Sequence, residues 1–255
     1  MPFALDRRIG RISGRLGRLL LDQLFPAQCL RCKADVGEPR TLCAECWSKI
    51  RFIDGAVCPV CGSPYESPSE TGLVCGACLA DPPPFARARS VFRYDEASRD
   101  LVLPFKHADR LEGVPAFAAW LARAGGELVG KADWIAPVPL HWGRLLRRRY
   151  NQASLLANAL AKRSHVPVLA DLLIRRRPTA SQGEMRSRRA RKLNVAGAFT
   201  LNPRHASAIK DRHILLVDDV LTTGATVTAC ARTLKRAGAN EVSVVTLARV
   251  VRQDQ

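Results

Sequence analysis

The pattern of apolar and polar residues changes near Ser90. After this residue, short apolar runs alternate with longer stretches in which apolar residues recur at helical spacing. Strands are predicted at SVFRY, DWIAPVPL, VLADLLIR, HILLVDDV and EVSVVTLARV, and helices at residues 114–128, 152–163 and 225–237, the last ended by Gly238. This alternation predicts an α/β fold with a parallel sheet flanked by helices.

The chain before Ser90 has a different organisation. Residues 29–80 show little apolar periodicity and are rich in Gly, Pro, Ser and Cys, and residues 81–89 begin with the stiff linker Asp81-Pro82-Pro83-Pro84. Residues 1–28 are basic with interspersed leucines, which predicts an amphipathic helix that packs on its own protein, with attachment to a membrane surface as the alternative. We therefore expect four regions: residues 1–28, 29–80, 81–89 and 90–255.

Eight of the nine cysteines form four Cys-x-x-Cys pairs. The pairs are Cys29/Cys32, Cys43/Cys46, Cys58/Cys61 and Cys75/Cys78. A turn with this spacing directs two thiolates at one metal ion, whereas a disulfide framework has no reason to repeat it. We therefore expect two closed sites of four cysteines, each holding one structural Zn²⁺ in an N-terminal zinc-ribbon module. Sequential pairing is favoured, and a cross-braced exchange of pairs remains open.

The cysteines and the overall charge also limit where the protein acts and what it binds. Free thiolates indicate a reducing, cytoplasmic location, and Cys230 lies in a predicted helix as a small buried residue. The formal net charge of +17 favours polyanionic partners, although a generally arginine-rich composition is an alternative explanation. No apolar run approaches the roughly 20 residues of a transmembrane helix, and the N-terminus lacks the apolar core of a signal peptide.

The segment LLVDDVLTTGATV, residues 215–227, combines an apolar strand, two acids and a hydroxyl-rich loop before a helix. Such a loop presents backbone N–H groups at a helix N-terminus, where a phosphate binds readily. It lacks the glycine pattern of a Walker A or Rossmann loop. Asp218 and Asp219 would repel a bare phosphate, so we expect them to face ribose hydroxyls or a divalent cation. A ribose carrying a 5′-phosphate satisfies both halves of the segment.

The sequence V-D-D-V-L-T-T-G-A-T resembles the 5-phosphoribosyl-1-pyrophosphate (PRPP) binding motif of type I phosphoribosyltransferases, and it matches at each position of residues 217–226. The resemblance implies a type I phosphoribosyltransferase-like fold and Mg²⁺ bound together with PRPP. Catalytic roles fall on Asp218 and Asp219. The implied PRPP-binding residues are Asp218, Asp219, Thr222, Thr223, Gly224, Ala225 and Thr226.

The order of segments along the whole chain resembles the ComF family of competence-associated proteins. It comprises the Cys-x-x-Cys pairs, a Pro-rich linker, a strand with Tyr94, a Lys106 segment, APVPLHWGRLLRRRYNQAS, a Gln182…Arg191…NVAGAF segment and the PRPP motif. The resemblance implies a role in DNA uptake during natural transformation. The family often has glycine at the position of Arg149, so the resemblance does not predict the local backbone at this residue.

Several basic or polar residues are candidates for binding pyrophosphate. Residues 137–142 are the expected pyrophosphate loop, and Arg148, Arg149 and Asn151 lie just beyond it. Residues 175–194, with eight basic residues and including Gln182 and Arg191, are a candidate lid; contact with nucleic acid and a solvated loop are the alternatives. Lys106 follows a strand-like run and is a further phosphate candidate. The histidines show no ligand spacing and are interpreted as structural.

Two hypotheses for function remain open. In the first, the protein is a phosphoribosyltransferase in which an acceptor attacks the anomeric carbon of Mg-PRPP. In the second, it is a non-catalytic accessory that binds single-stranded DNA at a basic surface, with Trp142 and Tyr150 as stacking residues, and uses the PRPP pocket for binding or regulation. DNA-uptake machinery is then a further partner. No residue indicates the acceptor.

Overall fold

The structure is a computed structural model that describes residues 26–106, 111–177, 195 and 197–251, without the side chains of Lys106, Arg144, Arg147 and Arg148. The chain forms two compact units, Met1–Lys49 and Ile50–Gln255. The expected N-terminal helix lies almost wholly outside the described residues. The first unit carries the cysteines from Cys29 to Cys46 and the short helix α2 (Ala44–Lys49). The second unit carries everything else.

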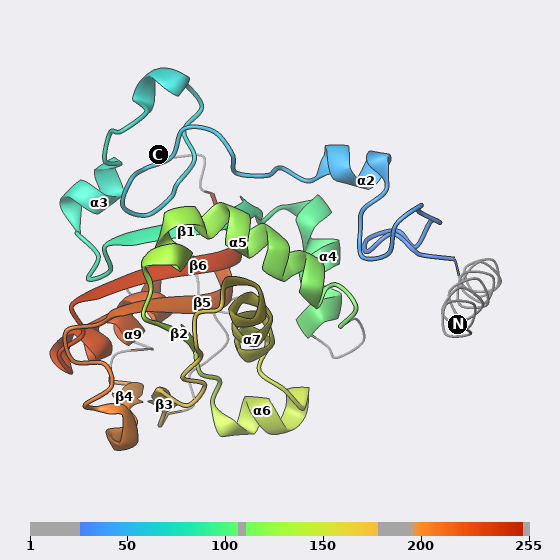
Figure 1. Cartoon of the computed structure of the whole chain (residues 1–255). Helices are drawn as coiled ribbons and strands as arrows, with labels where there is room; N and C mark the ends of the chain where they lie inside the picture. Colours follow the sequence, from blue (N-terminus) through green and yellow to red (C-terminus); the bar gives the residue numbers. More distant parts are fainter. Residues whose placement is uncertain (1–25, 107–110, 178–194, 196, 252–255) are drawn as a thin grey trace, which may run out of the picture. The chain divides into compact units, whose positions relative to one another are not determined.

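A parallel sheet of four strands forms the centre of the second unit (Figure 1). The strands, in spatial order, are β1 (Arg87–Arg93), β6 (Glu241–Arg249), β5 (His213–Leu221) and β2 (Trp134–Pro137). All three pairings are parallel, which confirms the α/β prediction. β5 and β6 are long apolar strands buried on both faces, as parallel strands covered by helices must be.

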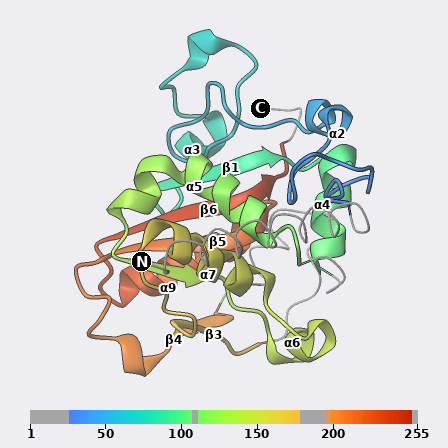
Figure 2. The ribbon, with the colours of Figure 1, turned by 45° about the vertical axis from the view of Figure 1, so that its right-hand side comes forward.

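Helices cover both faces of this sheet (Figures 1 and 2). α5 (Val114–Lys131) and α7 (Gln152–Ser164) pack together on one face, and α9 (Ala225–Arg236) lies on the other. Leu121 of α5 and Leu156 of α7 are fully buried, and so are Cys230 and Leu234 of α9. Cys230 is therefore a core residue, as its position in a predicted helix indicates.

Two sequence-based predictions are wrong in detail. The run before Lys106 is not a strand but the helix α4 (Glu96–Lys106). Asp95 and Ser98 start it, because the N–H of Ser98 donates to Asp95 Oδ1 at 3.0 Å and the N–H of Asp95 donates to Ser98 Oγ at 2.9 Å. These reciprocal bonds satisfy backbone donors that a helix start leaves open.

The segment VLADLLIR is also not one continuous strand. Only β3 (Leu173–Arg175) is a strand, and it pairs antiparallel with β4 (Phe199–Leu201) in a separate sheet of two strands. Asp171 interrupts the run, because its carboxylate accepts from Asn202 Nδ2 at 2.8 Å and lies 2.7 Å from His205 Nε2. Asn202 caps the short 3-10 helix Pro203–His205, so this polar cluster holds a turn where the apolar pattern predicts a strand.

The second cysteine segment, residues 58–78, packs on the edge strand β1. It contains the 3-10 helix Pro68–Glu70 and leads into α3 (Gly76–Ala80). The N–H of Ala88 in β1 donates to the carbonyl of Val60 at 2.7 Å, and Gly62 has a φ of 72° at the closest approach. The remaining helix is α6 (Trp142–Arg148). No helix within the described ranges is both long enough and apolar enough to cross a membrane.

Candidate functional site

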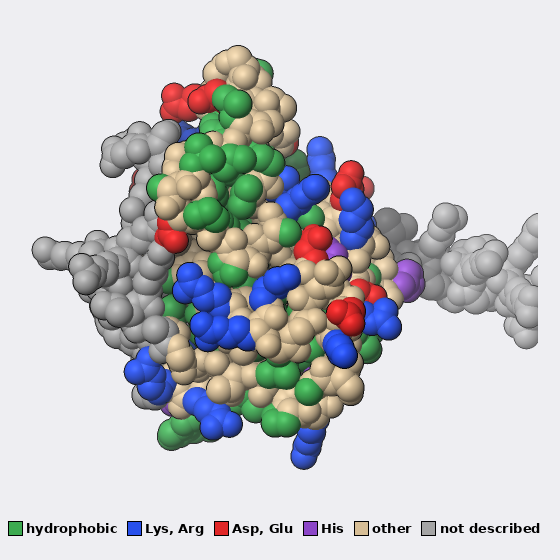
Figure 3. All heavy atoms as spheres, turned by 90° about the vertical axis from the view of Figure 1, so that its left-hand side faces the viewer, with side chains coloured by type: hydrophobic (Ala, Val, Ile, Leu, Met, Phe, Trp, Pro, Cys, Tyr) green, Lys and Arg blue, Asp and Glu red, His purple; other side chains and the backbone are tan. Residues whose placement is uncertain are grey.

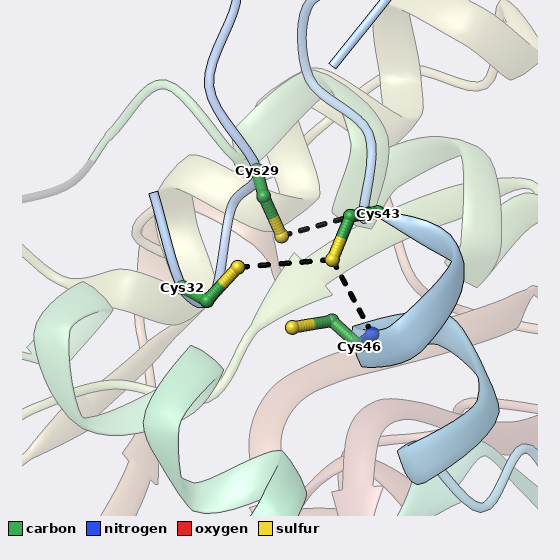
Figure 4. Close-up of side chains that lie close together, drawn as sticks. All are labelled: Cys29, Cys32, Cys43 and Cys46. Atoms are coloured by element: carbon green, nitrogen blue, oxygen red, sulfur yellow. Dashed lines mark hydrogen bonds between the residues drawn. The ribbon is translucent and has the colours of Figure 1, made fainter. Parts of the chain in front are cut away.

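The first cysteine segment, residues 29–46, brings four thiols together (Figure 4). The sulfur atoms of Cys29, Cys32, Cys43 and Cys46 all lie within 4.8 Å of one another, and the Sγ atoms of Cys32 and Cys43 are 3.7 Å apart. Four sulfurs at about 2.3 Å from a tetrahedral Zn²⁺ are separated by roughly 3.8 Å. The donor set therefore fits a closed zinc site with no position for a substrate.

The second cysteine segment repeats this arrangement with Cys58, Cys61, Cys75 and Cys78. The Sγ atoms of Cys61 and Cys75 are 3.7 Å apart, and the N–H of Cys75 donates to Cys58 Sγ at 3.4 Å. Each group combines two consecutive Cys-x-x-Cys pairs. The pairing that the sequence leaves open is therefore sequential and not cross-braced.

The thiols within each group differ in acidity. Burial raises the pKa of Cys29, but backbone N–H groups including those of Cys32 and Cys43 outweigh it and lower the pKa to about 6. Cys58 has a pKa of about 6 for the same two opposing reasons. Burial raises the pKa of Cys46 to about 12, so four thiolates form together only when a cation compensates their charge. This electrostatic demand supports structural zinc at both groups.

Asp218 and Asp219 lie at the carboxyl end of β5, where ligands bind in open parallel sheets. Both are half-buried. Asp218 Oδ1 accepts from the N–H of Asp219 at 2.9 Å, and Asp219 Oδ1 accepts from the N–H of Val220 at 2.6 Å. These local bonds each use one oxygen of a carboxylate, so the chain holds the two acids in fixed orientations beside the following loop.

The loop of residues 222–226 joins β5 to α9. Gly224 caps α9 with a φ of 75°, a left-handed conformation that favours glycine, and a Cβ there would approach no other atom closer than 3.9 Å. The backbone conformation, and not crowding, therefore requires this glycine. Thr223 Oγ1 is buried and finds no hydrogen-bond partner among the described residues. A buried hydroxyl in this state is costly, and a ligand oxygen would satisfy it.

A cavity of about 100 Å³ borders this loop. Its walls come from the loop, α9, the end of β6 and the second cysteine segment with its proline linker. The lining residues are Cys61, Ala77, Cys78, Asp81, Pro82, Pro83, Phe85, Leu221, Thr222, Thr223, Gly224, Ala225, Thr228, Arg232, Arg249 and Val250. All of the predicted phosphate-loop residues except Thr226 thus share one cavity with two arginines.

The sequence did not single out Arg232 and Arg249. Arg232 is exposed on α9, one turn beyond Thr228. Arg249 ends the apolar strand β6 and is only 9% exposed, with its guanidinium donating to the carbonyl of Cys61. The one available signal is a charged residue inside the otherwise apolar run VVTLARVV, since buried arginines almost always have a partner.

The expected pyrophosphate loop, residues 137–142, is attached to β5 immediately before the two acids. The N–H of Val138 donates to the carbonyl of Val217 at 2.9 Å, and Asn151 Nδ2 donates to the carbonyl of Val138 at 3.0 Å. His141 begins α6, because its Nδ1 accepts from the N–H of Gly143 at 3.3 Å. The loop therefore lies beside the acid pair, and the hydrogen bond from Asn151 holds its backbone in place.

Arg149 ends α6 with a φ of 65°. Glycine adopts this left-handed conformation without steric cost, whereas an arginine there is strained. Of the other candidates, Lys106 and Arg148 end helices and their side chains are not described. Gln182 and Arg191 lie outside the described residues, as does the candidate lid except for residues 175–177. The hydroxyl of Tyr150 donates to the carbonyl of Phe105 at 2.7 Å, whereas Trp142 is exposed.

Two family models match separate parts of the chain. Residues 20–79 match a model described as a double zinc ribbon domain, and residues 151–254 match one described as a phosphoribosyl transferase domain. A solved structure described as the allosteric regulatory enzyme of purine biosynthesis is 19% identical, with a TM-score of 0.37; the alignment covers 57% of this chain and 30% of that chain.

Several curated relatives match over most of their length. The DNA utilization protein YhgH of Escherichia coli is 33% identical over 234 residues, which are 89% of this chain and 98% of the relative. Competence protein ComFC of Bacillus subtilis is 30% identical over 216 residues, which are 82% of this chain and 84% of the relative. With two four-cysteine groups ahead of a parallel-sheet phosphoribosyltransferase domain, the chain belongs to the ComF family.

Proposed function

We propose that this protein binds PRPP, or another ribose 5-phosphate ligand, at the carboxyl end of β5 and serves in DNA uptake. The observation that carries the proposal is the arrangement around Thr223. Its buried hydroxyl, which has no hydrogen-bond partner within the described part of the chain, lies in the loop that joins the end of β5, with Asp218 and Asp219, to the N-terminus of α9. A phosphate oxygen would satisfy the hydroxyl, and the ribose diol would meet the acids.

Each part of the site has a distinct task in this proposal. Backbone N–H groups at the start of α9 and the threonine hydroxyls hold the 5′-phosphate, aided by the helix dipole. Asp218 and Asp219 accept hydrogen bonds from the 2′- and 3′-hydroxyls. They also place negative charge close to a ribose ring that becomes cationic when pyrophosphate departs. Mg²⁺ bound with PRPP would neutralise the pyrophosphate charge.

The role in DNA uptake is supported by the names of the relatives, a DNA utilization protein and a competence protein. A second candidate function, direct binding of single-stranded DNA, is favoured by the charge of the chain. Lys and Arg side chains gather on the face shown in Figure 3. On α9, Arg232, Lys235 and Arg236 are exposed, and the chain as a whole carries a formal charge of +17. Such a surface attracts phosphate backbones without reading sequence.

Calorimetry with PRPP and Mg²⁺ tests the pocket. We expect wild type to bind and the double variant Asp218→Asn/Asp219→Asn to lose at least roughly tenfold in affinity, as expected for two hydrogen-bonded charges. Asp54→Asn is the matched control, because Asp54 is an exposed acid that belongs neither to β5 nor to the loop of residues 222–226. Equal affinity in wild type and the double variant would contradict the site.

Two further measurements separate the functional classes. Release of pyrophosphate from PRPP in the presence of nucleobases or ammonia would demonstrate a transferase; its absence despite PRPP binding would favour the accessory role. Affinity for a labelled oligonucleotide should fall as salt rises, and it should fall less steeply in the variant Arg232→Gln/Lys235→Gln/Arg236→Gln. A salt dependence identical to that of wild type would exclude these side chains from the DNA contact.

A further inference from the structure

Arg249 connects the second four-cysteine group to the sheet. Its side chain leaves the end of β6, and its exposed fraction is only 9%. Nη1 donates to the carbonyl oxygen of Cys61, and Nη2 lies 3.6 Å from the sulfur of the same cysteine. One side chain therefore contacts both the backbone and the metal-binding atom of Cys61.

The backbone around Arg249 leads directly to the phosphate loop. Arg249 is paired with Leu221 in the register of β5 and β6, and the next N–H, that of Val250, donates to the carbonyl of Leu221 at 2.9 Å. Leu221 is the residue immediately before Thr222. Two contacts, from Cys61 to Arg249 and from Val250 to Leu221, thus link the sulfur of Cys61 to the start of the loop. Cys61 and Thr222 line the same cavity.

The contact depends on charge. A buried guanidinium is stable only when it is paired, and Zn²⁺ held by four thiolates carries a net negative charge that provides the pairing. Without the metal the four sulfurs are no longer held together beside the guanidinium, and the neutral carbonyl of Cys61 is a weaker partner for Arg249. The end of β6, and with it the start of the loop at Leu221, then loses part of its support.

We infer that metal binding at the second four-cysteine group and anion binding at residues 222–226 are coupled through Arg249, which acts as a positioning residue. The part of this inference that concerns anion binding rests on the proposed function, whereas the part that concerns the effect of the metal on the loop does not. Coupling between sites is reciprocal, so zinc should favour the anion-binding form of the loop, and a bound anion should raise the affinity for zinc.

The first four-cysteine group offers a matched comparison. Arg31 Nη1 lies 3.8 Å from Cys46 Sγ, so this group also has an arginine against a metal-binding sulfur. Arg31 belongs to the other compact unit, however, and its contact spans only 15 residues of the chain. Because Arg31 acts only on its own zinc site, replacing it should leave the conformation of the loop of residues 222–226 unchanged.

Hydrogen exchange measured by mass spectrometry on the zinc-loaded full chain tests the effect on the loop. In Arg249→Gln we expect peptides covering residues 215–230 to exchange about tenfold faster than in wild type, a typical size for coupled sites. Arg249→Lys, which keeps the charge, should restore part of the protection, and Arg31→Gln should leave exchange in these peptides as in wild type. Unchanged exchange in Arg249→Gln would overturn the inference.

A milder variant answers the objection that Arg249→Gln simply fails to fold. Cys61→His keeps a zinc ligand but removes the sulfur that faces Arg249. With two zinc ions retained and a wild-type circular dichroism spectrum, this variant should still show faster exchange confined to the loop and the end of β6. Faster exchange throughout the sheet would indicate general destabilisation and would count against a positioning role.

Zinc release to a colorimetric chelator tests the reciprocal effect, with Mg-PRPP as the probe. At equilibrium with the chelator, PRPP should raise the zinc affinity of the second group by about tenfold in wild type and leave it unchanged in Arg249→Gln. If PRPP binds equally to both proteins without raising the zinc affinity, the coupling is wrong and the proposed function stands. If PRPP does not bind wild type, the proposed function fails, and the exchange experiment alone decides whether metal orders the loop.

Discussion

Asn151 joins the candidate pyrophosphate loop to α7, because its Nδ2 donates to the carbonyl of Val138 at 3.0 Å while its Oδ1 accepts from the N–H of Ala153 at 3.1 Å. Both ends of the amide are therefore used within the chain. The same loop is bonded to β5 through Val138 and Val217. Asn151 thus holds the loop beside Asp218, and an effect of this residue on ligand binding would be indirect.

Replacing Asn151 by alanine should lower the free energy of unfolding by about 1–2 kcal/mol, because a helix cap and a second hydrogen bond are lost together. Chemical denaturation measures this. Asn158→Ala on the same helix is the control, since Asn158 is exposed and its side chain donates to Ser154, one turn earlier. A loss no larger than that of Asn158→Ala would mean that the two bonds of Asn151 contribute little.

Replacing Thr223 by valine should have opposite effects on stability and on binding. Removing a buried hydroxyl that has no partner among the described residues should leave the ligand-free protein equally stable or up to about 1 kcal/mol more stable. Affinity for Mg-PRPP should fall about tenfold, since the ligand phosphate loses a hydrogen bond. Thermal unfolding and calorimetry on the same samples test both. A stability loss with unchanged affinity would show that the hydroxyl serves the fold.

Gly62→Ala should separate the second cysteine segment from β1. A Cβ at Gly62 would lie 2.3 Å from the carbonyl oxygen of Ala88, and the φ of 72° is unfavourable for alanine. We expect a loss of roughly 2 kcal/mol or more in unfolding free energy. Gly72→Ala is the control, because Gly72 also has a positive φ but nothing within 4 Å of its Cβ position. Equal losses in both variants would exclude a steric effect at Gly62.

Asp133 should make stability depend on pH. The backbone N–H of His213, at 2.8 Å, lowers the pKa of this carboxyl; partial burial opposes the shift and Arg212 adds to it. A lowered folded pKa stabilises the protein above the unfolded pKa, and this contribution disappears as pH falls through the folded pKa.

Asp133→Asn should therefore be less stable than wild type at neutral pH, by less than about 1 kcal/mol because the carboxylate is partly exposed to solvent. The difference should shrink as pH falls through the ordinary range of an aspartate and vanish once pH lies below the lowered folded pKa of Asp133. Denaturant titrations over this pH range measure it. A difference that persists at low pH would trace the effect to packing and not to the charge.

Purified protein should contain two zinc ions per chain, as the two four-cysteine groups predict. Elemental analysis checks this. Cys32→Ser should remove one ion and leave the sheet folded, because Cys32 belongs to the first compact unit. Cys75→Ser should also destabilise the sheet, since its segment packs on β1. Two ions retained in either variant would contradict the ligand assignment.

The local pattern of residues was sufficient to predict the strands β5 and β6 and the helix α9. The apolar runs of β5 and β6 are long, and Gly224 and Gly238 flank the helix α9 that connects them. The pattern was insufficient to predict the secondary structure of residues 101–105, because this short apolar run is as compatible with a strand as with a helix. The hydrogen bonds between Asp95 and Ser98 decided in favour of the helix α4.

The sequence by itself determined the eight metal-binding cysteines, the parallel α/β fold and the acid pair followed by a hydroxyl-rich loop, because each depends on spacings of a few residues. Only the tertiary structure decided which cysteine pairs share a site and that Arg249 reaches Cys61, a residue 188 positions away. Periodicity records which side of an element is buried. It does not record which element covers that side, since apolar burial has no directional preference. Partners that are distant in sequence are therefore set by packing of the whole unit.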